Sequence, residues 1–293
     1  AGSGFATTEL RVMLIRLVDR ASRMHPSVTP TVFVDDISAE ATGSEEHVTV
    51  HVVGFTLLIC EAIVADGMEL SDKKCLCTAS SDKLGRAVEA GLRVYSIKYT
   101  RYVKALGVGL GAGTIRNVKV LADRVKSFCR KSARYKKLRR GGVDTARVIR
   151  TGGISGITYG AAITGVSPAL LLKMRRKTAA AGSPSSGTGG HQLDSALMMM
   201  DGSRSGRADP AFEAHEAPIT QWATAAWEHR LPRSALLSLV AQAKVTPTTA
   251  KRMWAVVRGP AAAMVAPAAR LGWTVQDAFN LVTDLGEPLK VLE

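Results

Sequence analysis

The chain has 293 residues, of which 46% are hydrophobic and 5% aromatic, and its net charge is +14. This length suits about two domains with a buried core, and four cysteines without an evident disulfide framework argue against a small disulfide-rich secreted protein. The chain begins with Ala and no signal peptide follows, so we expect a fragment or a processed piece of an intracellular protein.

The positive charge is concentrated in one part of the chain. Residues 1–100 hold 10 basic and 13 acidic side chains, residues 101–180 hold 19 and 2, and residues 181–293 hold 10 of each. A local basic block is the electrostatic feature expected of a phosphate-binding surface. A protein that is merely basic and soluble would spread this charge more evenly.

The first elements are predicted from apolar spacing and turn residues. A helix is expected over residues 8–24, and a short strand over residues 31–34 leads directly into Asp35 and Asp36. A capping-box pattern opens a long helix over residues 42–65. The apolar run inside that helix is too short to cross a bilayer, so we expect a buried helix and no membrane partner.

The elements that follow complete an α+β pattern. A strand is expected over residues 74–79, a helix over 81–92 and an extended segment over 95–108. The order strand, turn, helix, strand, helix, strand is typical of the α+β class. Glycine then stands at every second position over residues 107–113, which we interpret as a flexible hinge.

Residues 115–140 predict a strongly basic helix with a narrower apolar stripe that includes Leu138. Four of its basic residues recur at i, i+4, i+8 and i+11 on one face, and such a row can follow a phosphate backbone and release counterions. Aromatic residues do not alternate regularly with the basic residues of this helix, so neither base stacking nor sequence readout is indicated. We predict a nucleic-acid-binding face, the alternative being a solvated face beside an acidic partner protein. The predicted contact residues are Lys119, Lys126, Arg130, Arg134, Lys137 and Arg140.

The C-terminal part is expected to be mostly helical. Two short helices are predicted within residues 143–177, and a Gly-, Ser- and Ala-rich linker over 178–209. A small helical domain with all four tryptophans follows over 210–293, and its last helix is expected to start at Thr274 and Asp277.

The segment from Phe33 to Asp36 is the most distinctive motif in the chain. Adjacent carboxylates at the tip of a β-hairpin can hold hard cations that keep most of their water, as Mg²⁺ does. Nucleotidyl transfer needs two such ions, one to activate the attacking 3′ oxygen and one to stabilise the leaving oxygens. The motif therefore suits a polymerase palm, while a plain turn is the alternative explanation of the same dipeptide.

A second metal site is a weaker hypothesis. His47 and His51 are four residues apart on a predicted helix, and Cys75 and Cys77 share one face of a predicted strand. These four side chains would form a zinc site if they converged. A buried helix and a buried strand explain the same residues.

Residues 31–108 resemble the palm of non-LTR-retrotransposon reverse transcriptases from motif C onward. The segment 33–36 resembles the family's aromatic-x-Asp-Asp box, and the helix over 40–65 takes the place of the helix after it. Residues 70–80 resemble motif D, and residues 103–107 resemble the Leu-Gly of the primer-grip strand.

The resemblance continues beyond the palm. The basic block is similar to the family's thumb and connection, and the stretch around Gly259 and Pro260 is similar to retroelement polyproteins of protist genomes. The implied fold is α+β, with a partial palm at residues 1–108 and a basic helical thumb and connection at 109–177, ahead of the linker and the C-terminal domain.

The resemblance implies an RNA-directed DNA polymerase in the nucleus, with an RNA template, a DNA primer, deoxynucleoside triphosphates and two Mg²⁺ ions. Asp35 would be a direct metal ligand, and Asp36 a further ligand or an outer carboxylate. Lys74, or alternatively Lys73, would lie near the triphosphate as a general acid.

This sequence departs from the family's pattern in one important respect. The motif A strand with its own metal-binding Asp, motif B and most of the fingers are not found in the chain. One carboxylate ligand would therefore have to come from outside it. The alternative hypothesis is a catalytically inactive, basic nucleic-acid-binding remnant of a retroelement.

Overall fold

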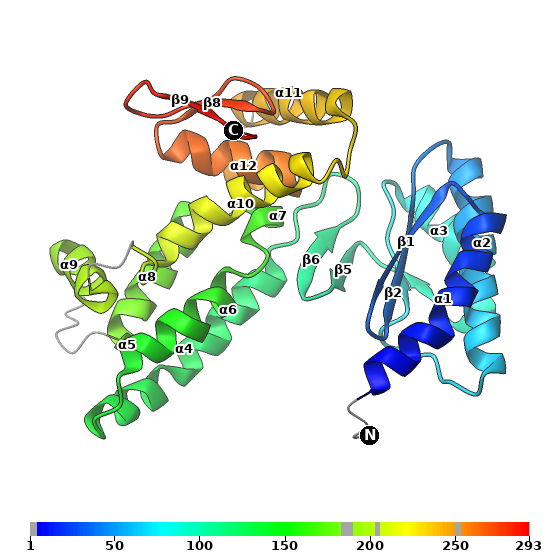
Figure 1. The fold of residues 1–293 in the computed structure, drawn as a ribbon, viewed down its shortest axis with the longest axis horizontal. Helices are drawn as coiled ribbons and strands as arrows, with labels where there is room; N and C mark the ends of the chain where they lie inside the picture. The colour runs from blue at the N-terminus through cyan, green and yellow to red at the C-terminus, as the bar shows by residue number, and fades with distance from the viewer. Residues whose placement is uncertain (1–4, 183–189, 203–205, 250–252, 293) are drawn as a thin grey trace. The chain divides into compact units, whose positions relative to one another are not determined.

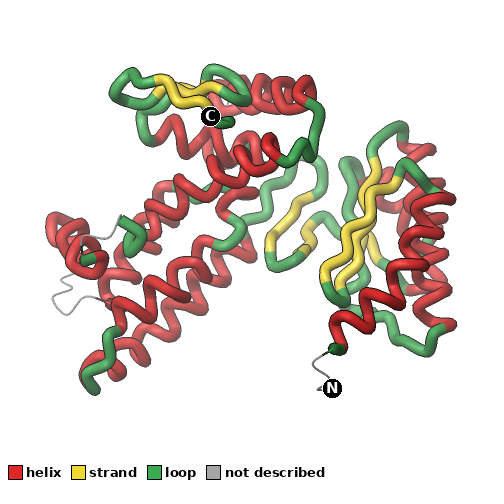
Figure 2. Tube along the Cα trace, viewed as in Figure 1, coloured by secondary structure: helices red, strands yellow, loops and turns green. Residues whose placement is uncertain are grey.

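The computed structural model describes residues 5–182, 190–202, 206–249 and 253–292. Helices predominate over small sheets (Figure 2), which confirms the predicted α+β class. The chain divides into two compact units, which are described separately below: unit 1 is residues 1–106 with 111–113, and unit 2 is residues 107–110 with 114–293. The division falls within the segment that holds the short strands β5 (Tyr102–Ala105) and β6 (Val108–Gly111).

Unit 1 packs helices against a β-hairpin (Figure 1). Its elements are α1 (Ala6–Met24), β1 (Val28–Phe33), β2 (Asp36–Ala41), α2 (Glu45–Ala65), β3 (Leu76–Cys77), α3 (Asp82–Gly91), η1 (Arg93–Tyr95) and β4 (Lys98–Tyr99). Strands β1 and β2 pair antiparallel, and β3 pairs parallel with β4. One apolar cluster joins Ala21 of α1, Val28 of β1 and Phe55 of α2.

Local side-chain caps determine where two of these helices begin. Ser81 caps α3 as expected, since its Oγ accepts a hydrogen bond from the amide of Leu84 at 3.2 Å. Helix α2 is capped by Ser44 rather than by Thr42, the residue that the capping-box pattern suggested. Lys83 and Glu45 form an ion pair of 2.7 Å between the starts of α3 and α2.

Helix α2 is less buried than its sequence suggested. Among the described residues it is the one helix long and apolar enough to cross a membrane, and 22% of its most apolar 18-residue window is buried. Its buried residues are Val48, Phe55, Ile59 and Cys60, and most of the others are partly exposed. The expected buried helix is therefore only partly covered by the rest of unit 1.

Unit 2 is mostly helical. Its helical elements are α4 (Lys119–Arg140), α5 (Thr145–Val148), the π-helical η2 (Ile149–Gly153), α6 (Ile154–Thr158), α7 (Ala161–Thr164), α8 (Pro168–Gly182), α9 (Gly190–Asp201), α10 (Pro210–Trp227), α11 (Arg233–Thr249), η3 (Met253–Ala255) and α12 (Gly259–Arg270). A sheet of β7 (Thr274–Val275), β8 (Asn280–Val282) and β9 (Pro288–Lys290) follows. One apolar cluster is centred on α4, α6, α8 and α9, and another on α10, α11, α12 and the sheet.

The segment expected to be a linker, residues 178–209, instead contributes to the core in its described part. It contains the end of α8 and all of α9. The α9 residues Leu193, Ala196, Leu197 and Met200 are buried in the same cluster as α4. Their i, i+3, i+4, i+7 spacing is that of an amphipathic helix, which the surrounding Gly- and Ser-rich composition concealed.

The helix expected to start at Thr274 and Asp277 is also wrong, because the chain forms a β-meander there. Thr274 pairs with Val282 in the antiparallel register of β7 and β8. The Asp277 carboxylate accepts hydrogen bonds from the amides of Phe279 and Asn280, at 2.7 and 3.0 Å. Asp side chains close turns as readily as they cap helices, and here the tertiary context selects the turn.

Trp222 should be a main source of stability in unit 2. Its side chain is 3% exposed, and its Nε1 donates to the backbone oxygen of Ala278 at 2.8 Å. We expect Trp222→Ala to lower the free energy of unfolding by about 3–5 kcal/mol, measured by urea denaturation. Trp227→Ala is the matched control, because Trp227 is 70% exposed, and its effect should stay within about 0.5 kcal/mol. Equal losses in the two variants would contradict this account of the core.

Candidate nucleic-acid interface

The start of α4 is held by close backbone packing within unit 2. The Asn117 side chain donates to the backbone oxygen of Leu110 at 3.1 Å and accepts from the amide of Lys119 at 3.3 Å. A Cβ at Gly109 would lie 2.7 Å from the Asn117 backbone oxygen, a distance that leaves no room for a side chain. Of the glycines at every second position over residues 107–113, Gly109 is therefore required for close packing.

Arg116 anchors the same segment from inside. Its guanidinium donates to the backbone oxygens of Thr164, Gly165 and Trp254, at 2.6 to 3.1 Å. Burial lowers the pKa of Arg116, and the carbonyl oxygens replace the water that the charge has lost. The N-terminal end of α4 is thus fixed to the middle and to the C-terminal part of the unit.

The inner face of α4 is apolar. Leu121, Val125 and Phe128 are buried, and the Tyr135 ring packs on Phe128 with centroids 5.5 Å apart. Leu138 was expected to extend this stripe but is 44% exposed. The buried stripe therefore lies in the first half of the helix, and the C-terminal half is exposed to solvent on more sides.

All six predicted contact residues are exposed on α4. Lys119, Lys126, Arg130, Arg134, Lys137 and Arg140 are exposed, as are Lys131 and Lys136. At 3.6 residues per turn, most of the six lie on the side opposite the buried stripe, and Lys119 and Lys137 are about 27 Å apart along the axis. Within the described part of the chain, no ion pair joins these eight residues to a carboxylate. The structure thus leaves this row of charge uncompensated.

Two other basic residues of α4 have an internal role. Arg124 lies over the Tyr159 ring, 4.7 Å from its centroid, and donates to the backbone oxygen of Gly107 at 3.0 Å. Arg139 donates to the backbone oxygen of Ala181 at 3.5 Å. These side chains hold the helix to the unit and are poorly placed to contact a ligand.

Helix α8 adds exposed basic residues that the sequence analysis did not include in the site. Lys173, Arg176 and Lys177 are exposed on this helix, which packs against α4. Their neighbour Arg175 is instead paired with Asp209, at 2.7 Å, and with Asp194. The run of basic residues in the α8 sequence was the available signal.

Asp35 and Asp36 lie at the tip of the β1–β2 hairpin, as expected. Phe33 pairs with Asp36, so Val34 and Asp35 form a two-residue turn, and both carboxylates are exposed. Val34 has φ +58°, a region that β-branched residues rarely adopt. A two-residue hairpin turn requires positive φ at its first position, so the pairing of the strands holds Val34 in this strained conformation.

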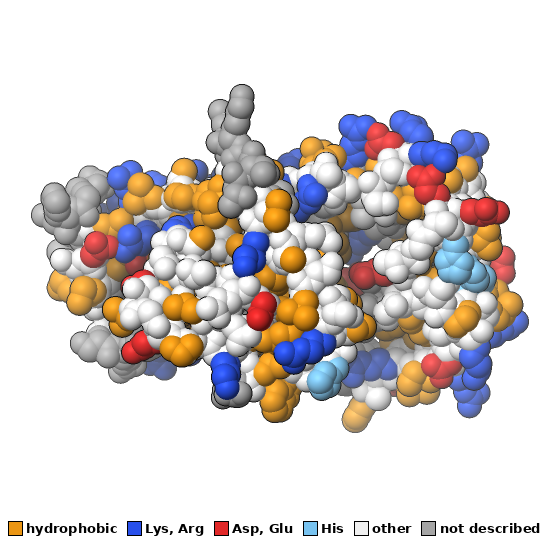
Figure 3. Space-filling view, turned by 90° about the horizontal axis from the view of Figure 1, so that it is seen from above, with side chains coloured by type: hydrophobic (Ala, Val, Ile, Leu, Met, Phe, Trp, Pro, Cys, Tyr) orange, Lys and Arg blue, Asp and Glu red, His pale blue; other side chains and the backbone are white. Residues whose placement is uncertain are grey.

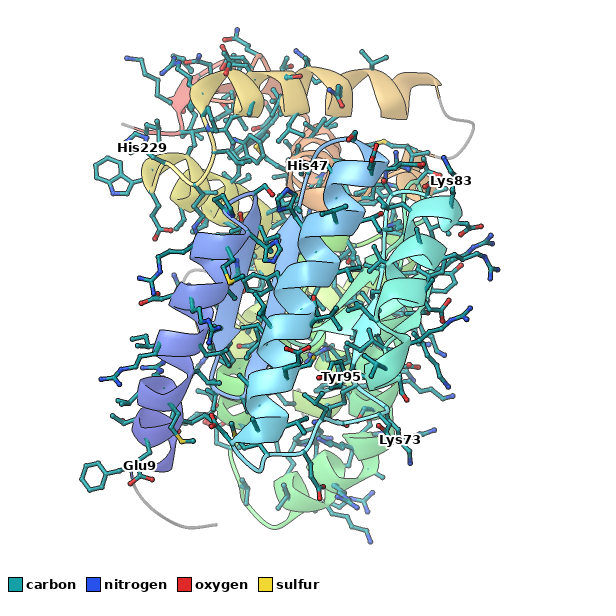
Figure 4. The ribbon with its side chains drawn as sticks, turned by 90° about the vertical axis from the view of Figure 1, so that its right-hand side faces the viewer. Glu9, His47, Lys73, Lys83, Tyr95 and His229 are labelled. Atoms are coloured by element: carbon teal, nitrogen blue, oxygen red, sulfur yellow. The ribbon has the colours of Figure 1, made fainter. Side chains whose placement is uncertain are left out.

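The other residues predicted for catalysis lie in a separate turn of unit 1. Lys73 and Lys74 are exposed just before β3. Figure 4 shows Lys73 at the same end of the unit as Glu9 near the start of α1, and in Figure 1 the hairpin turn lies toward that end. Lys73 thus lies at the end of the unit that holds the hairpin turn.

The described residues contain no ready-made metal site. No group of three or more His, Cys, Asp or Glu side chains is arranged among them to hold an ion. Asp35 and Asp36 therefore have no third carboxylate beside them, and the two predicted Mg²⁺ ions stay a prediction. His47, His51, Cys75 and Cys77 likewise do not form the four-ligand set considered above.

The cysteines are free thiols in the structure. Burial raises the pKa of Cys60 to about 11, and burial also raises the pKa of Cys77 to about 11. Neither thiol is therefore prone to ionise on its own near neutral pH.

The strain at Val34 can be measured. We expect Val34→Gly to raise the free energy of unfolding by about 1 kcal/mol. The left-handed region costs an L-residue roughly 1–2 kcal/mol, which glycine avoids. Glycine also loses more conformational entropy on folding, and this loss offsets part of the gain. Asp35→Gly is the control in the same turn, since Asp35 has no positive φ, and it should destabilise by roughly 0.5–1 kcal/mol. Urea denaturation measures both, and a loss of stability in both variants would show that the turn is unstrained.

No protein-family model, no curated protein and no solved structure matches the chain. The resemblance to reverse transcriptases therefore rests on the motifs themselves.

Proposed function

We propose that the chain binds nucleic acid through the exposed basic face of α4, without sequence preference, as part of the RNA-directed DNA polymerase of a retroelement. The observation that carries the binding proposal is the row of exposed basic residues on α4, none of them in an ion pair within the described chain. Each is free to exchange a counterion for a phosphate.

Phosphate backbone is a better ligand for this surface than bases. The row is straight and about 27 Å long, which suits the regular spacing of a nucleic-acid strand. The aromatic residues of α4, Phe128 and Tyr135, pack on each other instead of facing solvent, so no platform for base stacking accompanies the charges. The helix is therefore expected to hold a duplex or a strand by its backbone.

A second candidate function, nucleotidyl transfer, is favoured by the hairpin. Asp35 and Asp36 are exposed at a turn with a left-handed Val34, and carboxylates in such a position can hold Mg²⁺. The proposed substrates are deoxynucleoside triphosphates, added to a DNA primer on an RNA template. Lys74 would assist on the phosphate side, and a further carboxylate would have to join from outside this chain.

The catalytic and the purely binding versions of this proposal differ in the encoded protein upstream of residue 1. An apolar strand carrying an Asp, followed by a Gln-Gly box, favours the polymerase. Without that strand, the chain is better explained as a basic nucleic-acid-binding remnant of a retroelement.

Charge reversal on α4 tests the binding surface. The quadruple variant Lys126→Glu, Arg130→Glu, Arg134→Glu and Lys137→Glu should lose most of its affinity for a primed RNA template. Each phosphate contact contributes roughly 0.7–0.9 to the slope of log K against log salt, so the slope should become shallower by about 3–4. Fluorescence anisotropy across a salt series measures both quantities.

The matched control changes the same net charge elsewhere. The four exposed arginines of α1 are Arg11, Arg16, Arg20 and Arg23, and reversing them should leave the affinity for the primed template and its salt slope nearly unchanged. Equal losses of affinity in the two variants would show that net charge, and not the α4 face, accounts for the effect. Unchanged affinity of the α4 variant would point to an acidic protein partner and overturn the proposal.

The hairpin carboxylates should bind metal without affecting nucleic-acid affinity. We expect Mn²⁺, a paramagnetic substitute for Mg²⁺, to broaden the amide NMR signals around the hairpin turn. The double variant Asp35→Asn and Asp36→Asn should abolish this broadening and bind the template as the parent does. Broadening that persists in the double variant would exclude these carboxylates as the ligands.

A further inference from the structure

Three histidines lie together in unit 1, although one of them is far from the others in sequence. His25 follows the C-terminus of α1, and His47 and His51 are one turn apart on α2. The His25 and His51 Nδ1 atoms are 3.3 Å apart, and the His47 and His51 ring centroids are 4.4 Å apart. Figure 4 shows His47 near the beginning of α2, and histidine side chains reach the surface in Figure 3.

The position of His25 is a consequence of a glycine on α2. A Cβ at Gly54 would lie 2.3 Å from Cε1 and 2.6 Å from Nε2 of the His25 ring. Any larger residue would therefore push the ring away from α2. Ala21 of α1 and Phe55 of α2 belong to one buried apolar cluster, which packs the two helices together near this contact. The pair of imidazoles is thus fixed by packing.

The separation of the two nitrogens matches that of two ligands on one ion. At Zn–N distances of about 2.0–2.1 Å, two imidazole nitrogens of a tetrahedral site lie roughly 3.3–3.4 Å apart. His47 and His51 also have the i, i+4 spacing by which a helix presents two histidines to zinc. Burial and the proximity of His51 lower the pKa of His25, which favours the neutral ring that a metal needs.

We propose that His25 and His51 are the preformed half of a binding site for a divalent transition metal ion, which the His47 side chain completes when the ion binds. Imidazole ligands suit Zn²⁺ and Co²⁺. Three ligands are not assembled in this conformation, and His47 is exposed, so its ring has room to turn. The site is distinct from the hairpin carboxylates and from α4.

Two features of the surroundings bear on the binding of a cation. Glu46 lies in the first turn of α2, where its charge opposes the unfavourable effect of the helix dipole on a cation, whereas Glu45 is paired with Lys83. Without metal, one Nδ1 donates to the other across the 3.3 Å contact. Metal binding moves that proton to Nε2 of the same ring, so both Nδ1 lone pairs become available.

The first experiment titrates the chelator-treated chain with Co²⁺ and then displaces it with Zn²⁺. We expect one equivalent of Co²⁺ to give the intense visible absorption of tetrahedral nitrogen coordination. His51→Ala should weaken binding by more than about tenfold, and His25→Ala and His47→Ala should also weaken it. His229→Ala is the control, because His229 is exposed in unit 2, and it should bind as the parent does.

A second measurement does not depend on whether the variants fold. In the unaltered chain, Zn²⁺ should shift the imidazole carbon-bound proton signals of the three clustered histidines and leave those of His215 and His229 in place. The proposal is overturned if Co²⁺ binds without a tetrahedral spectrum, if His51→Ala binds as tightly as the parent, or if Zn²⁺ shifts all histidine signals alike.

Discussion

Burial of one face of α4 is the interaction on which unit 2 depends. Leu121, Val125 and Phe128 join this helix to the cluster that also includes parts of α6, α8 and α9. Because these apolar residues recur every three or four positions, the helix can face the core in only one orientation. The same orientation turns the basic residues outward, so the candidate binding surface follows directly from the packing of the core.

Unit 1 combines apolar packing with two polar features at different places. The β1–β2 turn keeps Val34 in a conformation that the pairing of the strands imposes, and it presents two carboxylates there. The histidine cluster joins the end of α1 to the beginning of α2. In the first case strand pairing positions the groups, and in the second the packing of α1 against α2 does so.

Local sequence signals predicted the parts that depend on local interactions. The Ser81 cap, the hairpin at Asp35 and Asp36 and the exposed face of α4 could be read from spacing and turn residues. The β-meander at the C-terminus could not, since Asp277 suits a helix cap and a turn equally well. The core helix α9 was hidden by a composition typical of linkers.

Contacts between distant segments could not be predicted either. The spacing of His47 and His51 was visible in the sequence, but the approach of His25 depends on how α1 packs against α2 and on the missing side chain at Gly54. Arg116 is a similar case, because its carbonyl acceptors lie 48 to 138 residues further along the chain. Such contacts follow from the tertiary arrangement, which no local pattern specifies.

The charge on α4 also affects how the chain responds to salt. Like charges four residues apart, as in Lys126 with Arg130 and Arg130 with Arg134, weaken a helix by roughly 0.2–0.5 kcal/mol per pair at low salt. A bound polyanion removes this repulsion and stabilises the folded state by mass action. Added salt therefore has two opposed effects: it screens the repulsion within the helix and competes with the polyanion. The unit is therefore least stable when it is free in dilute buffer, where a bound polyanion would serve as the counterion of α4.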